Sequence, residues 1–150
     1  MPLTITCSEH INAPVERVFD IASDPHNYAD VITAITKIEV LTDGPVGVGT
    51  RFRETRTMFG KEATEEMEFS IFDPPHSYTL VADSHGCHYV STFRFVPDGA
   101  GTRVEFDFTG EAHTFGAKVM SAVMGPLMKG TMRKMLAKDL GELKRHAESQ

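Results

Sequence analysis

The chain has 150 residues, of which 41% are hydrophobic and 24% are charged, and its formal net charge at pH 7 is −6. This balance is typical of a folded globular protein with one core and excludes a disordered chain. The sequence has no basic stripe and no tryptophan, which argues against nucleic acid as a partner. We expect a single domain over residues 1–150.

No apolar run approaches the ~20 residues needed to span a bilayer, so stable membrane insertion is not expected. The first ten residues, MPLTITCSEH, lack the basic and apolar regions of a signal peptide, and we therefore expect a cytoplasmic protein. Cys7 and Cys87 are not part of a CxxC pair, which argues against a structural zinc site, and a disulfide is not expected in a reducing compartment. Both are expected to be small core or cavity-lining groups.

The first elements alternate a strand with helices. Residues 3–11 alternate apolar and polar side chains, which predicts a half-buried strand. A helix is expected to follow, with Asn12 as its cap, Pro14 in its first turn and a buried face made of Val15, Val18, Phe19 and Ala22. The segment DPHNY ends this helix, and a second short helical turn is expected at residues 26–31.

From residue 35 onward, short strand-like segments alternate with turn signals. They predict six further strands, at residues 35–41, 50–58, 62–72, 77–84, 88–97 and 103–112. The short loops between them indicate an antiparallel meander. Residues 114–146 then predict one long helix, which the Gly125–Pro126 pair is expected to bend or restart. The apolar face of such a sheet must be buried against this helix, so we expect an α+β fold with a curved sheet.

Five segments carry a resemblance that runs along the whole chain: INAPVERVFDIASDPHNY (11–28), GPVGVGTRFRE (44–54), FDPPHSYTL (72–80), FVPDGAGTRVEF (95–106) and LGELKRHAE (140–148). With the order of elements, they resemble the START-like (SRPBCC) superfamily, and within it the polyketide cyclase/dehydrase-type and birch-pollen-allergen-like proteins. The resemblance implies the helix-grip fold: a seven-stranded curved antiparallel sheet wrapped around a long C-terminal helix, with two short helices between strands one and two. It also implies a deep apolar cavity for a small lipophilic ligand. After HNY, family members often carry a tryptophan, whereas this chain reads ADVIT.

The C-terminal helix is unusually rich in methionine, since residues 120–136 read MSAVMGPLMKGTMRKML. At a hundred degrees per residue, Met120 and Met124 share one face, and Met128, Met132 and Met135 continue the stripe after the proline. Unbranched, polarizable methionines suit the wall of a space whose contents vary in shape. The alternative is that they fill an irregular core around a bent helix.

The strand at residues 50–58 carries the most informative polar pattern. Phe52, Glu54, Arg56 and Met58 share one face, so a carboxylate and a guanidinium are expected to point into the cavity if the apolar residues do. Such a pair offers an orienting contact to a ligand hydroxyl or carbonyl. The alternative is a water-exposed ion pair of little energetic value. Asp139 interrupts the later helix stripe; we expect it to mark where the helix runs into solvent, with a polar contact in the cavity as the alternative.

Strand alternation assigns inward-facing sets on the remaining strands: Glu65, Met67, Phe69 and Ile71; Tyr78, Leu80 and Ala82; Cys87, Tyr89, Ser91, Phe93 and Phe95; and Val104, Phe106 and Phe108. Should the protein catalyse a reaction, the candidate catalytic residues are Glu54, Arg56, Tyr78 and Tyr89. The candidate ligand-binding residues are Phe52, Glu54, Arg56, Met67, Phe69, Tyr78, Tyr89, Ser91, Phe93, Phe106, Phe108, Met120, Met124 and Met128.

Other functional sites find little support in the sequence. The HGCH segment at residues 85–88 occupies a tight hairpin in which its histidines should diverge, so no metal site is expected. GPVGVG lies between two strands rather than before a helix, which argues against nucleotide binding. Ser121 lacks the flanking glycines of a nucleophile elbow. We expect no cofactor.

Three functions remain open on these grounds. The favoured one is a carrier, sensor or sequestering protein that binds a small hydrophobic molecule such as a lipid or polyketide. The second is a cyclase or dehydratase that folds its substrate by binding it and moves protons with Glu54 or a tyrosine. The third is an interaction protein whose cavity is vestigial, and a homodimer is a possible assembly.

Overall fold

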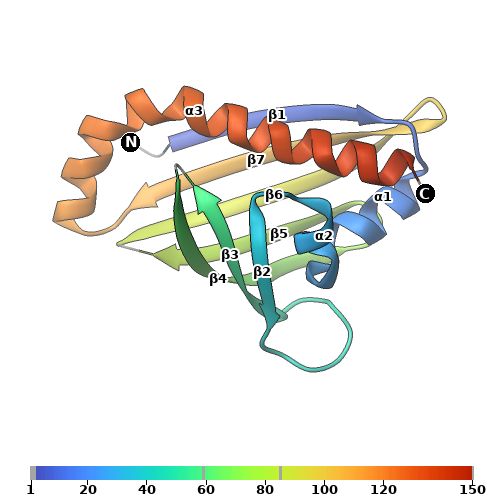
Figure 1. Cartoon of the computed structure of the whole chain (residues 1–150), viewed down its shortest axis with the longest axis horizontal. Coiled ribbons are helices and arrows are strands. Elements are labelled where there is room, and N and C mark those ends of the chain that lie inside the picture. The colour runs from blue at the N-terminus through green and yellow to red at the C-terminus, as the bar shows by residue number, and fades with distance from the viewer. Residues whose placement is uncertain (1–2, 59, 85, 150) are drawn as a thin grey trace.

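Figure 1 shows the computed structural model of the chain. The structure describes residues 3–58, 60–84 and 86–149, without the side chains of residue 3 and residues 120–128. In this described part, seven antiparallel strands form one sheet in the order β1-β7-β6-β5-β4-β3-β2. The strands are β1 (Leu3–Ile11), β2 (Ile35–Val40), β3 (Arg51–Met58), β4 (Lys61–Asp73), β5 (Ser77–Ser84), β6 (Cys87–Asp98) and β7 (Gly101–Ala112).

The helices lie between β1 and β2 and after β7. The first connection holds α1 (Val15–Ala22), a 3-10 turn η1 (Pro25–Asn27) and α2 (Tyr28–Val31), and α3 (Phe115–Glu148) follows β7. Figure 1 shows α3 running along β1, with its C-terminal end next to α1. The predicted α+β helix-grip architecture, with a curved sheet and a long C-terminal helix, is confirmed. The expected turn at residues 26–31 consists of η1 and α2.

The long helix is continuous through the Gly125–Pro126 pair. Its axis changes direction in its N-terminal half (Figure 1), which agrees with the expected bend. The Thr114 hydroxyl caps the helix by accepting a hydrogen bond from the Ala117 N–H at 3.1 Å.

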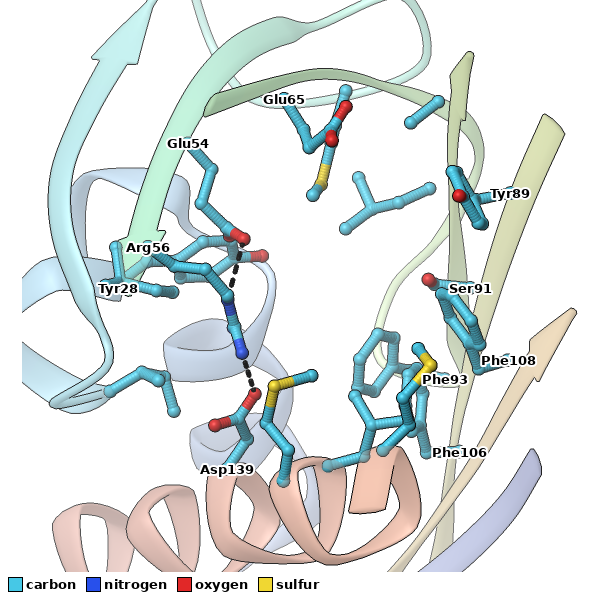
Figure 2. Close-up of a pocket in the computed structure, with 18 of the residues that line it drawn as sticks. Tyr28, Glu54, Arg56, Glu65, Tyr89, Ser91, Phe93, Phe106, Phe108 and Asp139 are labelled. Atoms are coloured by element: carbon cyan, nitrogen blue, oxygen red, sulfur yellow. Dashed lines mark hydrogen bonds and ion pairs between the residues drawn. The ribbon is translucent and has the colours of Figure 1, made fainter. Parts of the chain in front are cut away.

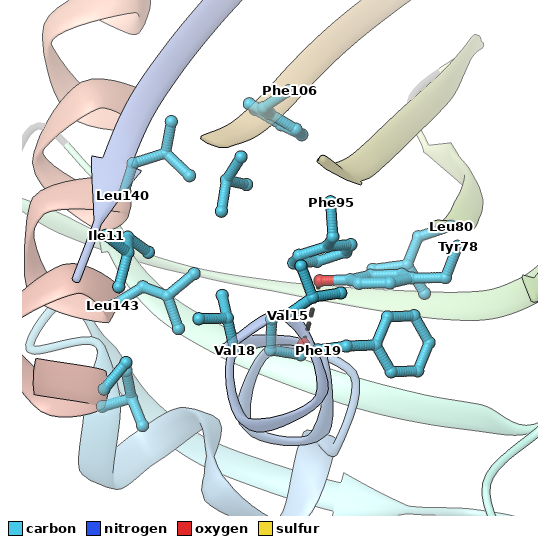
Figure 3. Packing of buried hydrophobic residues seen from close by; sticks show 14 of the residues in the cluster. Ile11, Val15, Val18, Phe19, Tyr78, Leu80, Phe95, Phe106, Leu140 and Leu143 are labelled. Carbon is cyan, nitrogen blue, oxygen red and sulfur yellow. Dashed lines mark hydrogen bonds between the residues drawn. The ribbon is translucent and has the colours of Figure 1, made fainter. Parts of the chain in front are cut away.

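A core of apolar side chains fills the end of the sheet next to α1. Val15, Val18, Phe19 and Ala22 are buried, as the helical pattern predicted. The ring of Phe19 meets those of Phe95, Phe72 and Tyr78 edge-on, at centroid distances of 5.3, 5.5 and 6.0 Å. Figure 3 shows that α3 contributes Leu140 and Leu143 to the same core, beside Ile11 and Val18.

One strand departs from the expected alternation. The register between β4 and β5 shifts between Phe69 and Ile71, as at a β-bulge. As a result Ile71, expected to face inward, is 52% exposed, and Phe72 packs against the core instead. A bulge inserts one residue and reverses which side chains face the core.

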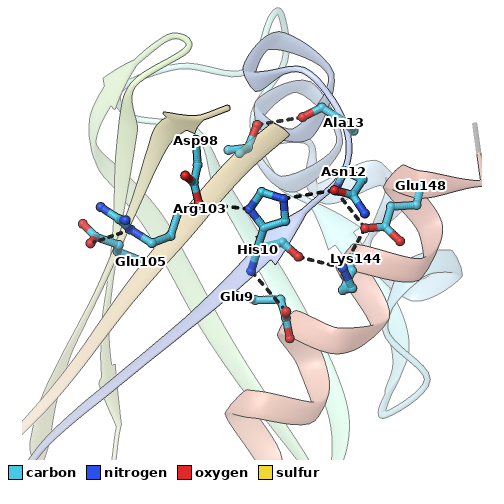
Figure 4. Close-up of polar contacts among 10 residues, drawn as sticks. Glu9, His10, Asn12, Ala13, Asp98, Arg103, Glu105, Lys144 and Glu148 are labelled. Atoms are coloured by element: carbon cyan, nitrogen blue, oxygen red, sulfur yellow. Dashed lines mark hydrogen bonds and ion pairs between the residues drawn. The ribbon is translucent and has the colours of Figure 1, made fainter. Parts of the chain in front are cut away.

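A polar network joins the C-terminal end of α3 to the end of β1 (Figure 4). Lys144 Nζ donates to the His10 carbonyl at 2.8 Å and to Glu148 Oε2 at 2.7 Å, and Glu148 Oε2 accepts the Asn12 N–H at 2.8 Å. Asn12 therefore does not cap α1: its Oδ1 lies 3.0 Å from His10 Nε2, and Pro14 is the cap residue without a side-chain bond. The expectation for Asn12 is wrong because α1 begins at Val15, which puts the cap position on Pro14, and the Asn12 side chain turns back to His10.

Replacing Phe19 with alanine should lower the free energy of unfolding by about 3–5 kcal/mol, because the change leaves a cavity among three aromatic rings. Phe115→Ala is the matched control, since Phe115 is 83% exposed, and it should change stability by less than ~0.5 kcal/mol. Urea unfolding of both variants measures the difference. Equal, small losses would show that α1 is not packed as described.

Candidate functional site

A cavity of about 400 Å³ lies between the concave face of the sheet and α3. Figure 2 shows it bounded by β3 and β4 on one side, by β6 and β7 on the other and by α3. Ile21 of α1 and Tyr28, Val31 and Ile32 in and beside α2 close the end nearest the core. The described residues that line the cavity are largely apolar, and the volume of the cavity is within the range of pockets for small ligands.

Most of the predicted ligand-binding residues meet at this cavity. Nine of those in the described part of the chain line it: Glu54, Arg56, Met67, Tyr78, Tyr89, Ser91, Phe93, Phe106 and Phe108. They come from β3 to β7, so the inward alternation of these strands is what gathers them. The side chains of Met120, Met124 and Met128 lie outside the described part, while Met132 and Met135 of the same stripe line the cavity.

Phe52 and Phe69 require a correction, since neither is among the residues that line the cavity. Both are fully buried in the core, and their ring centroids are 5.9 Å apart. Phe52 also meets the ring of Tyr28 at 5.7 Å, edge-on. They face inward as predicted, but the short helices after β1 cover their end of the sheet, so they support the wall from behind.

The main polar feature of the wall is an ion-paired cluster of Glu54, Arg56 and Asp139 (Figure 2). Arg56 Nε donates to Glu54 Oε2 at 3.3 Å, and Arg56 Nη1 lies 2.9 Å from Asp139 Oδ2. The second contact is a close ion pair that joins β3 to α3. The side chains of the three residues are 10%, 13% and 17% exposed. The pair predicted on β3 therefore faces the cavity and not bulk water.

Asp139 was expected to mark the exit of the helix into solvent, and that expectation is wrong. The residue lies on α3 where the helix passes opposite β3, and Arg56 reaches across the cavity to it (Figure 2). The helical stripe alone could not reveal this, because the partner is on a strand more than eighty residues away.

Burial dominates the protonation of this cluster. Removal from water raises the pKa of Glu54 and of Asp139 above their ordinary values, although the Arg56 guanidinium opposes both shifts. Burial by itself would lower the pKa of Arg56, but the two carboxylates outweigh it, and the pKa is raised. The guanidinium therefore stays charged between two carboxyl groups that hold their protons to higher pH than usual.

The tyrosines of the wall differ in whether their hydroxyls are already hydrogen-bonded to the protein. The hydroxyls of Tyr28 and Tyr78 both donate to the carbonyl of Ala22, at 2.7 and 2.9 Å, and burial raises the pKa of each. They are therefore structural donors, which weakens Tyr78 as a catalytic candidate. Tyr89 stacks on Phe108 at a centroid distance of 5.7 Å, and burial together with Cys87 raises its pKa to about 12. Tyr28 and Glu65 also line the cavity and were not among the predicted site residues.

The described residues form neither a metal site nor a membrane-spanning helix. No three of their His, Cys, Asp or Glu side chains are grouped to hold a metal ion. His88, in the HGCH segment, lies 2.8 Å from Asp83, and His85 is outside the described residues. None of the described helices is both long enough and apolar enough to cross a membrane.

A family model described as "Polyketide cyclase / dehydrase and lipid transport" matches residues 2–148. No curated protein matches the sequence. Among solved structures, the chain resembles Ara h 8.0201 with a TM-score of 0.77, 14% identity and 100% of both chains covered. A protein from Thermus thermophilus gives a TM-score of 0.69 at 24% identity, with 97% of this chain and 94% of that chain covered.

A further solved structure is the di-domain ARO/CYC protein BexL from the BE-7585A biosynthetic pathway. It gives a TM-score of 0.79 at 21% identity, with 99% of this chain and 51% of that chain covered. At these identities the likeness of all three structures is one of fold.

Arg56→Met should be strongly destabilising near pH 7, by about 3–5 kcal/mol, because it leaves two buried carboxyl groups without a counter-charge. Arg53→Met on the outer face of β3 is the matched control: Arg53 pairs with exposed Glu39 and Glu66, and its loss should cost at most about 1 kcal/mol. Urea unfolding provides the measurement.

The loss in Arg56→Met should also shrink as the pH falls. Both carboxyls have raised pKa values in the folded state, so they contribute stability below their ordinary pKa range and lose it as pH rises through the raised values. Unfolding at about pH 5 should therefore show a smaller difference from wild type than at about pH 7. A loss independent of pH would mean that Glu54 and Asp139 are not the groups that Arg56 neutralises.

Proposed function

The chain belongs to the polyketide cyclase/dehydrase and lipid transport family, and from this premise we propose that it binds a small hydrophobic molecule in the cavity between its sheet and α3. The observation that carries the proposal is an apolar space of about 400 Å³ with one buried charged cluster on its wall. Pockets for small ligands have this composition: apolar walls supply affinity, and a few polar groups fix orientation. The protein would act as a carrier, sensor or sequestering protein.

The polar cluster suggests how a ligand is oriented. The pairs with Glu54 and Asp139 engage only part of the five N–H donors of Arg56, so the guanidinium can also donate to a ligand carbonyl or hydroxyl. Its charge is held by Glu54 and Asp139, which keep the guanidinium fixed at the wall. Ser91 and Tyr89 face the same space from β6 and offer further hydroxyl contacts (Figure 2). A vestigial cavity in an interaction protein is less well supported, because the space is not packed shut.

The neutral dye N-phenyl-1-naphthylamine tests the cavity directly, since its fluorescence rises in apolar surroundings. The wild-type protein should bind it, and Ser91→Trp should weaken binding by about tenfold or more, because the indole occupies the space next to β6. Val90→Trp is the matched control on the outer face of the same strand and should bind the dye as wild type does.

A dye affinity that survives Ser91→Trp in a folded protein would contradict binding in this cavity. Native mass spectrometry of protein purified from its own host then addresses the natural ligand. A co-purifying apolar molecule that is absent from Ser91→Trp is the expected result.

A second candidate function is catalysis of the cyclase or dehydratase kind. The favouring observation is that burial raises the pKa of both Glu54 and Asp139. The pKa values of two carboxyl groups in an apolar site are thereby moved toward neutral pH, which suits proton transfer. A carboxyl tuned in this way can exchange a proton with a bound polyketone. Tyr89, with its pKa raised to about 12, is better suited to donate a hydrogen bond than to act as a base.

Glu54→Gln separates the two functions, because the amide keeps the shape of the side chain but cannot take up a proton. If the protein cyclises or dehydrates a supplied polyketone, turnover should fall by about a hundredfold or more while dye binding remains. Product analysis by mass spectrometry makes the measurement, with Glu66→Gln on the outer face of β4 as the control. Unchanged turnover would remove Glu54 as the proton-transfer group.

A further inference from the structure

The charges on the cavity wall are unbalanced. Among the described residues that line it, carboxyl groups come from Glu54, Glu65 and Asp139, whereas Arg56 is the one lysine or arginine. Arg56 is engaged by Glu54 and by Asp139, at 3.3 and 2.9 Å. The single cation is thus shared between two acids, and the third acid is left without a counter-charge among these residues.

Glu65 is that third acid. Its carboxylate accepts a hydrogen bond from Ser84 Oγ at 3.1 Å, and no described Lys, Arg or His nitrogen lies within 4 Å of it. In the β3–β4 ladder Glu65 stands directly opposite Glu54, while Ala63 stands opposite Arg56. The residue opposite Arg56 on β4 is therefore an alanine, which offers no charge. The Arg56 guanidinium turns toward Asp139 on α3 and away from Glu65.

Two acidic side chains directly opposite each other on neighbouring strands repel, and here both face a partly dehydrated space. Burial is the main cause of the raised pKa of Glu54 and of Tyr89, and the negative charge of Glu65 adds to both shifts from opposite sides of the cavity. A positive group placed beside Glu65 would turn this repulsion into attraction. A negative group would add to it.

The aromatic side of the cavity favours the same kind of ligand. The stacked rings of Tyr89 and Phe108 lie across the space from Glu54, and Phe93 and Phe106 stack with a centroid distance of 4.2 Å (Figure 2). The faces of aromatic rings carry partial negative charge and attract cations. The carboxyl groups and the electron-rich aromatic rings that line the cavity therefore both favour a cationic ligand over an anionic one.

We propose that the cavity selects its apolar ligand by charge: it takes hydrophobic molecules that carry a protonated amine, which Glu65 receives, and it rejects hydrophobic carboxylates such as fatty acids. This inference rests on the proposed binding function and names the ligand class for the same cavity. Hydrophobic alcohols, which lack charge, fall between the two classes.

Competition against bound N-phenyl-1-naphthylamine at about pH 7 tests the selection with three ligands of equal chain length: decylamine and decanoate below their micelle concentrations, and decan-1-ol below its solubility limit. Decylamine should displace the dye at a concentration about tenfold or more below that needed for decanoate, with decanol between them. Decanoate that competes as well as decylamine, or better, would overturn the inference.

Two single-residue variants separate Glu65 from the general negative charge of the protein, which by itself attracts amines. Glu65→Gln should remove most of the preference for decylamine while keeping dye affinity, which also shows that the variant is folded. Glu66→Gln removes the same charge from the outer face of β4, where Glu66 lies near Arg51 and Arg53, and should keep the preference.

The outcomes distinguish the two proposals. A dye that binds, with a preference lost equally in both variants or in neither, overturns selection by Glu65 and leaves the binding function standing. Failure of the wild-type protein to bind the dye at all contradicts the proposed function and this inference with it.

Discussion

The concave face of a curved sheet is wider than one helix can cover, and the rest of this structure follows from that mismatch. α3 packs along β1 and places Leu140 and Leu143 in the core, while α1 and α2 cover one end of the sheet. At that end Phe19 packs against three aromatic rings. Beyond it the side chains of α3 do not fill the space above the inward faces of β3 to β7, which leaves a cavity of about 400 Å³.

An apolar cavity of this size is costly if it stays empty, because its lining loses dispersion contacts that a packed core would make. A hydrophobic ligand restores those contacts, which is the physical reason why such a fold suits binding. Methionines on three elements of the wall, Met58, Met67 and Met132 among them, can adjust to ligands of different shape. The walls are thus adaptable where they touch apolar surface.

The Glu54–Arg56–Asp139 cluster has the opposite character. Burying three charged side chains stabilises a protein less than apolar residues of the same size would, so its value is better sought in specificity than in stability. The cluster joins β3 to α3 across the cavity and fixes one guanidinium against the space that a ligand would fill. Glu65, directly opposite Glu54 and without such a partner among the described residues, adds to the net negative charge of this wall.

Secondary structure and the inward faces were largely predictable because they are local properties of the chain. Period-two alternation located the strands within one or two residues, and it placed Glu54 and Arg56 on the cavity side of β3. Local reasoning failed at Ile71, where a bulge reverses the alternation, and at Asn12, whose side chain bonds to His10 instead of capping α1 while its backbone N–H bonds to Glu148 of α3. Neither a bulge nor a distant partner leaves a mark in the local pattern.

By itself, the sequence determined the order of strands and helices, the antiparallel meander and the set of side chains able to face a common interior, because periodicity and turn chemistry act over a few residues. Only the tertiary structure decided which of these side chains line open space and which are packed. Phe52 and Phe69 became core, Tyr78 became a structural donor, and Asp139 became a partner of Arg56. These outcomes depend on the curvature of the sheet and on where α2 and α3 cross it, and no local stretch of sequence encodes those angles.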